Sequence, residues 1–256
     1  MTARVRERLL ECRRLTVGHE QPVLRDVALA VDAGEIVALL GGSGCGKSTL
    51  LRTMTGLLPP KGGELRLFGE SLYDVDAAER AQLLRRTGTS FQQDALFGAM
   101  TVEDNVALPL RELTDVPAPV IREMVRSRLA MVGLAGFGPR RPATLSGGQR
   151  KRVALARATI LDPQLVFCDE PSSGLDPVVA AGLDETLLQL RDALGITLIV
   201  VTHELDSIRA IADRALMFAD GHVVAEGTID ELSASHDEAV HAFFHRIAEP
   251  APRARG

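Results

Sequence analysis

The sequence predicts an α/β fold in which helices cover a buried parallel sheet. Short apolar runs recur along the chain, each bounded by polar turns and separated from the next by a stretch with helical spacing, a pattern typical of buried parallel strands. The 256 residues, 46% of them apolar, are sufficient for the core of one large domain. The predicted strands lie at residues 36–40, 65–68, 165–168, 197–201 and 215–218.

The middle of the chain, from about residue 101 to 161, lacks these apolar runs and shows helical spacing instead. We expect a helical insertion into the sheet domain there, interrupted by prolines. These prolines are Pro109, Pro117, Pro119, Pro139 and Pro142. Further along, Asp220-Gly221 separates two apolar runs, which predicts a two-residue hairpin turn.

Composition and charge exclude several classes of protein. The chain has 29 basic and 34 acidic residues, and the resulting net charge of −5 argues against binding to nucleic acid. No uncharged apolar run approaches the roughly 20 residues that cross a bilayer, and the N-terminus is charged where a signal peptide is apolar. We therefore expect a cytoplasmic location, in which Cys12, Cys45 and Cys168 stay reduced.

A glycine-rich segment, Gly41 to Ser48, matches the pattern G-x-x-x-x-G-K-[ST] and lies between an apolar strand and a helical pattern. Glycines let successive backbone N–H groups turn inward, and the N-terminus of the following helix adds partial positive charge toward a phosphate. Lys47 would reach the β- and γ-phosphates, and the Ser48 hydroxyl would ligate Mg²⁺. The predicted phosphate-binding residues are Gly41, Gly42, Ser43, Gly44, Cys45, Gly46, Lys47, Ser48 and Thr49.

Two acidic residues, Asp169 and Glu170, follow the apolar run at 165–168. The carboxyl ends of parallel strands meet at one edge of a sheet, so these acids should lie at the same edge as the phosphate loop. Asp169 would hold Mg²⁺ through water, and Glu170 would act as the general base toward the attacking water. The alternative is an exposed acidic turn before Pro171.

The segment Leu145-Ser146-Gly147-Gly148-Gln149 precedes a helical pattern, with Ser146 and Gln149 at the spacing of a capping box. On local grounds it is a well-capped helix. With the phosphate loop before it and Asp169-Glu170 after it, the chain resembles, over about residues 10–232, the ATP-binding subunit of an ATP-binding cassette (ABC) transporter. In that family the segment is the signature, and we use this name for residues 145–149.

This resemblance implies a P-loop NTPase (RecA-like) core sheet, with an N-terminal antiparallel β-subdomain and an inserted α-helical signature subdomain. The chain is expected to form one ABC ATPase domain. Its nucleotide-binding core would take residues 1–98 and 162–233, its helical subdomain 99–161, and its C-terminal helix and tail 234–256.

The resemblance also assigns roles to single residues. Gln92 would lie in a loop, here called the glutamine loop, that senses Mg²⁺ and touches the permease. Asp176 would lie at the seam of a dimer, and His203 would be the switch histidine that contacts the γ-phosphate. As a lone residue, His203 would more often be a histidine satisfied at a strand end. Two subunits, identical or closely related, would enclose two ATP molecules, each phosphate loop facing the signature of the other subunit.

One departure from the family concerns the adenine. Residues 1–47 contain no Phe, Tyr or Trp to stack on the base. His19 stands where the aromatic residue is expected, and its imidazole would stack more weakly. The alternative for His19 is a solvated loop histidine.

Three stretches, 91–97, 100–121 and 239–248, resemble a narrower group, the Mla-type ATPases that power phospholipid transport with MCE lipid-shuttle proteins. Gln149 stands where that group often carries Met. The resemblance implies ATP hydrolysis with Mg²⁺, coupled to separate membrane permease subunits, an MCE-type lipid-binding protein and a small regulatory subunit. The location would be the cytoplasmic face of the inner (plasma) membrane.

Several alternatives stay open. The chain could serve a polar-solute importer, a lipoprotein system or a cell-division system, or be an ABC ATPase without a transport role. Leu96 and Phe97 could dock the permease or pack in the core. An amphipathic pattern at the C-terminus, which packs on its own domain or on a partner, comprises Val240, Phe243, Phe244 and Ile247.

A basic cluster surrounds the signature. It could meet anionic headgroups or phosphate, but we expect a solvated helix face. Its members are Arg140, Arg141, Arg150, Lys151, Arg152 and Arg157.

Overall fold

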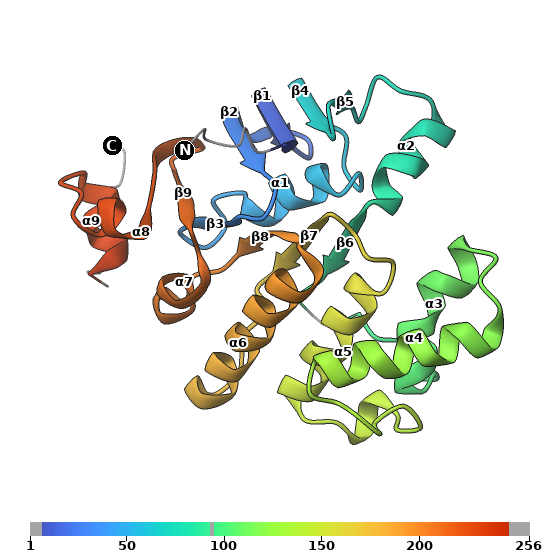
Figure 1. Cartoon of the computed structure of the whole chain (residues 1–256). Coiled ribbons are helices and arrows are strands. Elements are labelled where there is room, and N and C mark those ends of the chain that lie inside the picture. Colours follow the sequence, from blue (N-terminus) through green and yellow to red (C-terminus); the bar gives the residue numbers. More distant parts are fainter. Residues whose placement is uncertain (1–6, 93–94, 246–256) are drawn as a thin grey trace, which may run out of the picture.

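The computed structural model describes residues 7–92 and 95–245, and its chain forms two sheets with helices around them (Figure 1). Ile247 of the predicted C-terminal pattern lies outside these residues. Within the described ranges, none of the helices combines the length and apolar character needed to cross a bilayer.

The first sheet is antiparallel and includes the N-terminal strands. Its order is β2-β1-β4-β5, and it comprises β1 (Arg8–Gly18), β2 (Pro22–Asp32), β4 (Gly62–Leu67) and β5 (Glu70–Ser71). The run at 65–68 belongs here, so its assignment to the parallel sheet is wrong. Leu65 and Leu67 of β4 are buried while Glu64 and Arg66, which alternate with them, are partly exposed, a pattern typical of an antiparallel sheet with one buried face.

The second sheet is the parallel one that the apolar runs predict, extended by one antiparallel edge strand. Its order is β10-β9-β3-β8-β7-β6. Its strands are β3 (Ile36–Gly41), β6 (Thr87–Ser90), β7 (Leu165–Asp169), β8 (Thr197–Val201), β9 (Arg214–Ala219) and β10 (His222–Gly227).

The edge hairpin confirms the predicted turn. Ala219 pairs with His222, and Asp220 and Gly221 have φ values of 48° and 80° between them. Strand β6 was not predicted, because its sequence is short and polar. A Cβ added to Gly88 on this strand would lie 2.0 Å from the carbonyl oxygen of Ala158, so a neighbouring helix requires the absence of a side chain there.

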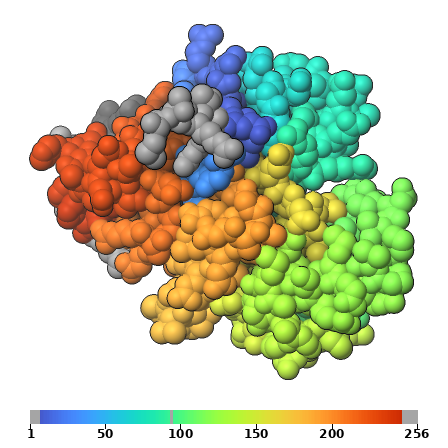
Figure 2. Space-filling model, viewed as in Figure 1, coloured from blue at the N-terminus to red at the C-terminus, as the bar shows by residue number. Residues whose placement is uncertain are grey.

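Three longer helices between β6 and β7 form a separate layer, which Figure 1 shows at the end of the molecule opposite α8 and α9. They are α3 (Val102–Leu113), α4 (Ala118–Met131) and α5 (Gly147–Thr159), with a short 3₁₀ turn at Pro142–Thr144. Pro109 lies inside α3 rather than at a break, whereas Pro117 precedes α4 as its N-cap. In Figure 2 the green surface of α3 and α4 forms a distinct lobe.

The remaining helices cover the sheets. They are α1 (Lys47–Met54), α2 (Ala77–Arg85), α6 (Pro177–Leu194), α7 (Leu205–Ile211), α8 (Ile229–Ser233) and α9 (Glu238–Phe244). Val240 and Phe244 of α9 are buried against β3, β9 and α8, which favours packing of this helix on its own chain. Leu96 packs against the core of the helical layer, whereas Phe97 is 51% exposed.

The parallel strands determine where the predicted site residues lie. Strands β3, β8, β7 and β6 are neighbours with parallel pairing, so their carboxyl ends share one edge of the sheet. The phosphate loop follows β3, the acidic pair ends β7, His203 follows β8 and Gln92 follows β6. Segments more than 100 residues apart in the sequence therefore converge at this edge.

Candidate active site

The phosphate loop is closed on one side and open on the other. Gly41 and Gly46 have φ values of 144° and 107°. A Cβ at Gly41 would lie 2.4 Å from the carbonyl oxygen of Phe218. A Cβ at Gly42 or Gly44 would meet nothing within 4 Å. The backbone of the loop is thus fixed from behind by the sheet, while its outer side leaves room for a ligand.

Lys47, at the start of α1, turns its side chain back across the loop. Its Nζ donates hydrogen bonds to the carbonyl oxygens of Gly41 (2.8 Å) and Gly42 (2.9 Å) and lies 3.6 Å from Sγ of Cys45. The residue is only 8% exposed. A buried ammonium group therefore stands beside the open face of the loop, where it can exchange these neutral acceptors for an anionic one.

Ser48 and Asp169 bring the loop and the acidic pair together. The Ser48 hydroxyl donates to Oδ1 of Asp169 at 3.4 Å. Burial, and then the nearby charge of Glu170, raises the pKa of Asp169, although the bond from Ser48 and the charges of Arg52 and Lys47 oppose this. A cation placed between these oxygens would relieve the repulsion between the two carboxylates.

Glu170 is held in an unusual backbone conformation. Its φ is 49°, in the left-handed region, and its N–H donates to the carbonyl oxygen of Val201 on the neighbouring strand at 2.8 Å. The residue is 9% exposed, so the alternative of an exposed acidic turn is wrong. Oε1 lies 2.9 Å from Nδ1 of His203. Oε2 is buried and has no hydrogen-bond partner among the described residues.

His203 is positioned by the end of β8. Its side chain is 61% exposed, so the ring reaches the surface while Nδ1 contacts Glu170. This geometry gives the carboxylate one oriented oxygen and one buried oxygen that is available to a ligand or a water molecule.

Gln92 is exposed, and its side chain makes no hydrogen bond within the described part of the chain. Its carbonyl oxygen instead accepts a hydrogen bond from Nζ of Lys151 at 2.9 Å. Gln92 therefore lies at the expected sheet edge, where its main-chain carbonyl group is hydrogen-bonded and its side chain is exposed.

The signature starts helix α5, and its capping box is confirmed. Ser146 Oγ accepts from the N–H of Gln149 (3.3 Å), whose side chain accepts from the N–H of Ser146 (3.0 Å). Gly148 lies so close to α6 that an added Cβ would be 2.4 Å from Cγ1 of Val179. No hydrogen bond joins residues 145–149 to the phosphate loop of the same chain within the described ranges.

Asp176 and His19 lie at the surface. Asp176 is the N-cap of α6, with Oδ1 accepting from the N–H of Val179 at 3.1 Å. His19 is in the exposed turn between β1 and β2. The next strand, β2, passes behind the phosphate loop, because a Cβ at Gly46 would lie 2.9 Å from side-chain atoms of both Val23 and Leu24.

The expectation that the basic cluster forms a solvated helix face is wrong for part of it. Lys151, one of its members, also contacts the candidate active site, which the sequence did not predict. Arg140 and Arg141 are exposed, but Lys151 is only 8% exposed and Arg152 is partly buried. Arg152 donates to the carbonyl oxygens of Val132 and Gly182, and Lys151 to those of Gln92 and Glu170. The scarcity of lysine was the one signal in the sequence, since only Lys47, Lys61 and Lys151 occur among 29 basic residues.

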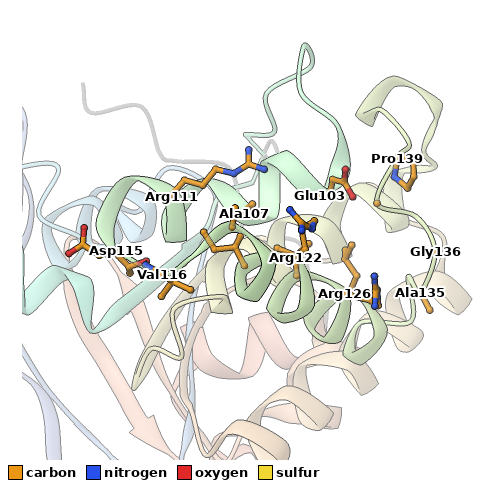
Figure 3. Close-up of a pocket in the computed structure, with 16 residues that line it drawn as sticks. Glu103, Ala107, Arg111, Asp115, Val116, Arg122, Arg126, Ala135, Gly136 and Pro139 are labelled. Carbon is orange, nitrogen blue, oxygen red and sulfur yellow. The ribbon is translucent and has the colours of Figure 1, made fainter.

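A separate groove of about 850 Å³ lies between α3 and α4 (Figure 3), and neither Asp169 nor Glu170 lines it. Its apolar lining includes Ala107 and Ile121, and Arg111 and Arg126 stand at it. Arg111 pairs with Asp104, and Arg126 with Glu123, each at 2.9 Å. The two carboxylates that line the groove, Glu103 and Asp115, lie at opposite ends of α3, and neither the acidic pair nor the phosphate loop lines it, so the candidate active site is the sheet edge.

Comparison with known proteins adds three findings. The sequence model of the family described as ABC transporter matches residues 24–173. The chain is 40% identical to the intermembrane phospholipid transport system ATP-binding protein MlaF of Escherichia coli K12, over 90% of this chain and 86% of MlaF. It is also 40% identical to the probable ribonucleotide transport ATP-binding protein mkl of Mycobacterium tuberculosis H37Rv, over 87% of this chain, and it spans 62% of that relative's length.

Among solved structures, a dimeric post-hydrolysis state of the ATP-binding cassette MJ0796, bound to ADP and Pi, matches with a TM-score of 0.78. The match has 31% sequence identity and covers 86% of this chain and 98% of the MJ0796 chain.

Proposed function

The chain belongs to the ABC transporter family, and we propose that it binds and hydrolyses ATP to drive a separate membrane permease that moves phospholipid. The observation that carries the ATPase proposal is the buried Oε2 of Glu170, which has no partner in the described chain and lies at the same sheet edge as the phosphate loop. A carboxylate in this position is suited to receive a proton from an attacking water molecule.

The residues present fit ATP and Mg²⁺. The open side of the loop at Gly42 and Gly44, with Lys47 beside it, accommodates phosphate groups. Ser48, Asp169 and Gln92 would hold Mg²⁺, which when bound neutralises charge on the β- and γ-phosphates. Burial and the charge of Glu170 raise the pKa of Asp169, and a bound cation would oppose both effects by favouring the charged form.

The chain's own residues would carry the hydrolysis of ATP to ADP and phosphate as follows. Lys47 turns from the carbonyl oxygens to the phosphates. Glu170 takes a proton from the water that attacks the γ-phosphorus, and the bond to the ADP oxygen breaks. His203 keeps Oε1 of Glu170 oriented so that Oε2 faces the water, and it contacts the γ-phosphate.

We propose that the signature acts on the ATP of a second copy of the chain. The N–H groups of Gly147 and Gly148 at the start of α5, together with the exposed Ser146, form an anion site that the same chain's phosphate loop does not use. Exposed Asp176 and Val178, the latter 81% exposed, would then lie at the dimer seam. The dimeric state of MJ0796, to which the chain is similar, supports the dimer in this proposal. His19 is proposed to stack on the adenine.

The phospholipid cargo rests on the similarity to MlaF. By the same similarity, the partners would be permease subunits at the cytoplasmic face of the inner membrane, an MCE-type lipid-binding protein and a small regulatory subunit. Phe97, exposed beside the glutamine loop, would contact the permease. The similarity to mkl, a probable ribonucleotide transport protein, supports a second cargo class, a ribonucleotide or another polar solute.

The test is purification of the tagged chain from detergent-solubilised native membranes, followed by mass spectrometry of proteins and lipids. A permease with an MCE-type protein and glycerophospholipid supports the proposal. A permease without them removes the lipid cargo, and no membrane partner overturns the transport role. Phe97→Ser should reduce recovery of the permease, whereas Leu57→Ser, at a position 63% exposed elsewhere on the surface, should not.

A further inference from the structure

Lys151 connects the signature helix to two other parts of the candidate active site. It lies in α5, two residues after Gln149, and is almost fully buried. Its Nζ donates to the carbonyl oxygens of Gln92 (2.9 Å) and Glu170 (3.3 Å). A buried ammonium group without hydrogen-bond partners costs free energy. The two bonds therefore hold Lys151 close to the carbonyl groups of Gln92 and Glu170.

The hydrogen bond from Lys151 to Glu170 restrains a residue whose backbone is strained. The N–H of Glu170 is fixed to Val201 on β8, and its carbonyl oxygen is bonded to Lys151 on α5. The main chain is therefore held on both sides of a Cα whose φ is 49°. Left-handed conformations of residues other than glycine persist when surrounding contacts enforce them, and they set the direction of the side chain. Lys151 thus helps to direct the carboxylate toward His203.

The bond to Gln92 has a counterpart farther along α5. Nη1 of Arg157 donates to the carbonyl oxygen of Ala95 at 2.8 Å, and Ala95 also has a left-handed φ of 48°. Helix α5 is consequently bonded to the glutamine loop at Gln92 and again at Ala95. A displacement of α5 would move both points of attachment together.

We propose that Lys151 is a positioning residue that keeps Glu170 and the glutamine loop aligned with the signature of the same subunit. The inference rests on the proposed ATPase function and adds a route of communication to it. When the signature binds the ATP held by the other subunit, α5 takes up a defined position. Lys151 then holds Glu170, the general base of its own subunit, in the matching position. Correct placement of Glu170 then depends on occupancy of the other ATP site.

The side-chain type suits this role. A lysine ammonium is compact and has three donors on a flexible stem, so it can serve two carbonyl groups that belong to different segments. The chain otherwise uses arginine for 26 of its 29 basic residues, including the neighbouring positions 150 and 152.

The experiment compares steady-state ATP hydrolysis and nucleotide binding of Lys151→Met, Lys151→Arg and the control Lys61→Met in the full chain. Lys61 is exposed at the start of β4. Lys151→Met should lower kcat by about 10-fold or more while the KM and the dissociation constant for ATP change less than about threefold. Lys151→Arg, which keeps the charge and the donors but not the compact ammonium group, should have a kcat between those of Lys151→Met and wild type, and Lys61→Met should match wild type.

A double substitution separates positioning from general structural support. If Lys151 acts through Glu170, Lys151→Met should slow single-turnover hydrolysis in the wild-type background but not in the Glu170→Gln background. Equal slowing in both backgrounds, or an unchanged kcat for Lys151→Met, would overturn the inference. If circular dichroism shows that Lys151→Met does not fold, Lys151→Gln, with one short amide donor, replaces it in the same comparisons. Absence of ATP hydrolysis by the wild type, or full activity of Glu170→Gln, would instead refute the proposed function.

Discussion

Nδ1 of His203 lies 2.9 Å from Oε1 of Glu170, at the ends of the adjacent parallel strands β8 and β7. The contact joins an exposed imidazole to a buried carboxylate whose other oxygen has no partner in the described chain. The two residues therefore form a unit in which one orients the other.

Glu170→Gln should bind ATP and accumulate a closed dimer, because the amide keeps the shape of the side chain but cannot take a proton. Hydrolysis should fall by about 10²-fold or more. Size-exclusion chromatography with and without ATP, together with phosphate release, measures both effects. Glu204→Gln, which removes a neighbouring acid, is the matched control and should hydrolyse ATP normally. Near-normal turnover of Glu170→Gln would remove Glu170 from the role of base.

His203→Ala should lower kcat by about 10- to 100-fold, because Oε1 of Glu170 loses its partner. The affinity for ATP should change far less, since the phosphate loop is untouched. His222→Ala, at an exposed position on β10, controls for the loss of a histidine. An unchanged kcat, or an equal loss of ATP affinity, would show that His203 does not act by orienting Glu170.

Alkylation of Cys45 should block ATP binding, because its Sγ lies 3.6 Å from Nζ of Lys47 and an added group there would displace the ammonium group that is to bind the phosphates. Cys12 and Cys168 are buried, and burial raises the pKa of both thiols, that of Cys168 to about 12. At pH 8 these two should stay protonated and unreactive, so one label per chain is expected by mass spectrometry. Cys45→Ser should resist labelling, and full ATP binding after stoichiometric labelling of Cys45 would contradict the prediction.

Asp169→Asn should raise the melting temperature of the nucleotide-free chain at pH 7. Burial raises the pKa of Asp169, so the folded chain binds a proton at this site more readily than the unfolded chain. The charged form therefore lowers stability above the raised pKa, and this cost disappears as the pH falls toward the unfolded value of about 3.9. The stabilisation by Asn should shrink in the same interval.

Differential scanning fluorimetry across that pH range measures the effect, with Asp220→Asn in the exposed β9–β10 turn as the control. The same variant should lose most of the additional stabilisation that Mg²⁺ and ATP give to the wild type. A melting temperature below that of wild type at pH 7 would contradict the prediction.

Local patterns predicted the parts of the site that depend on local chemistry. The phosphate loop from Gly41 to Ser48, the capping box of Ser146 and Gln149, and the turn at Asp220-Gly221 all lie where their spacing indicated. Each of these needs only a few neighbouring residues to form, so the sequence contains the required information within one short window.

Features that depend on distant contacts could not be predicted. Strand β6 is short and polar, with Gly88 in contact with the backbone of α5. The run at 65–68 pairs antiparallel because of its partner β1, which its own hydropathy does not specify. Lys151 is buried because two carbonyl groups, at positions 92 and 170, need donors there, and no helical spacing around residue 151 encodes that need.

The turn between β9 and β10 has a practical consequence for engineering. The carbonyl oxygen of Gly221 accepts a hydrogen bond from the N–H of Arg25 on β2 at 2.8 Å, and a Cβ at Gly221 would lie 3.0 Å from the carbonyl oxygen of Val23. The same strand contacts Gly46 of the phosphate loop. A fluorescent reporter or peptide tag inserted at this turn would therefore disturb nucleotide affinity.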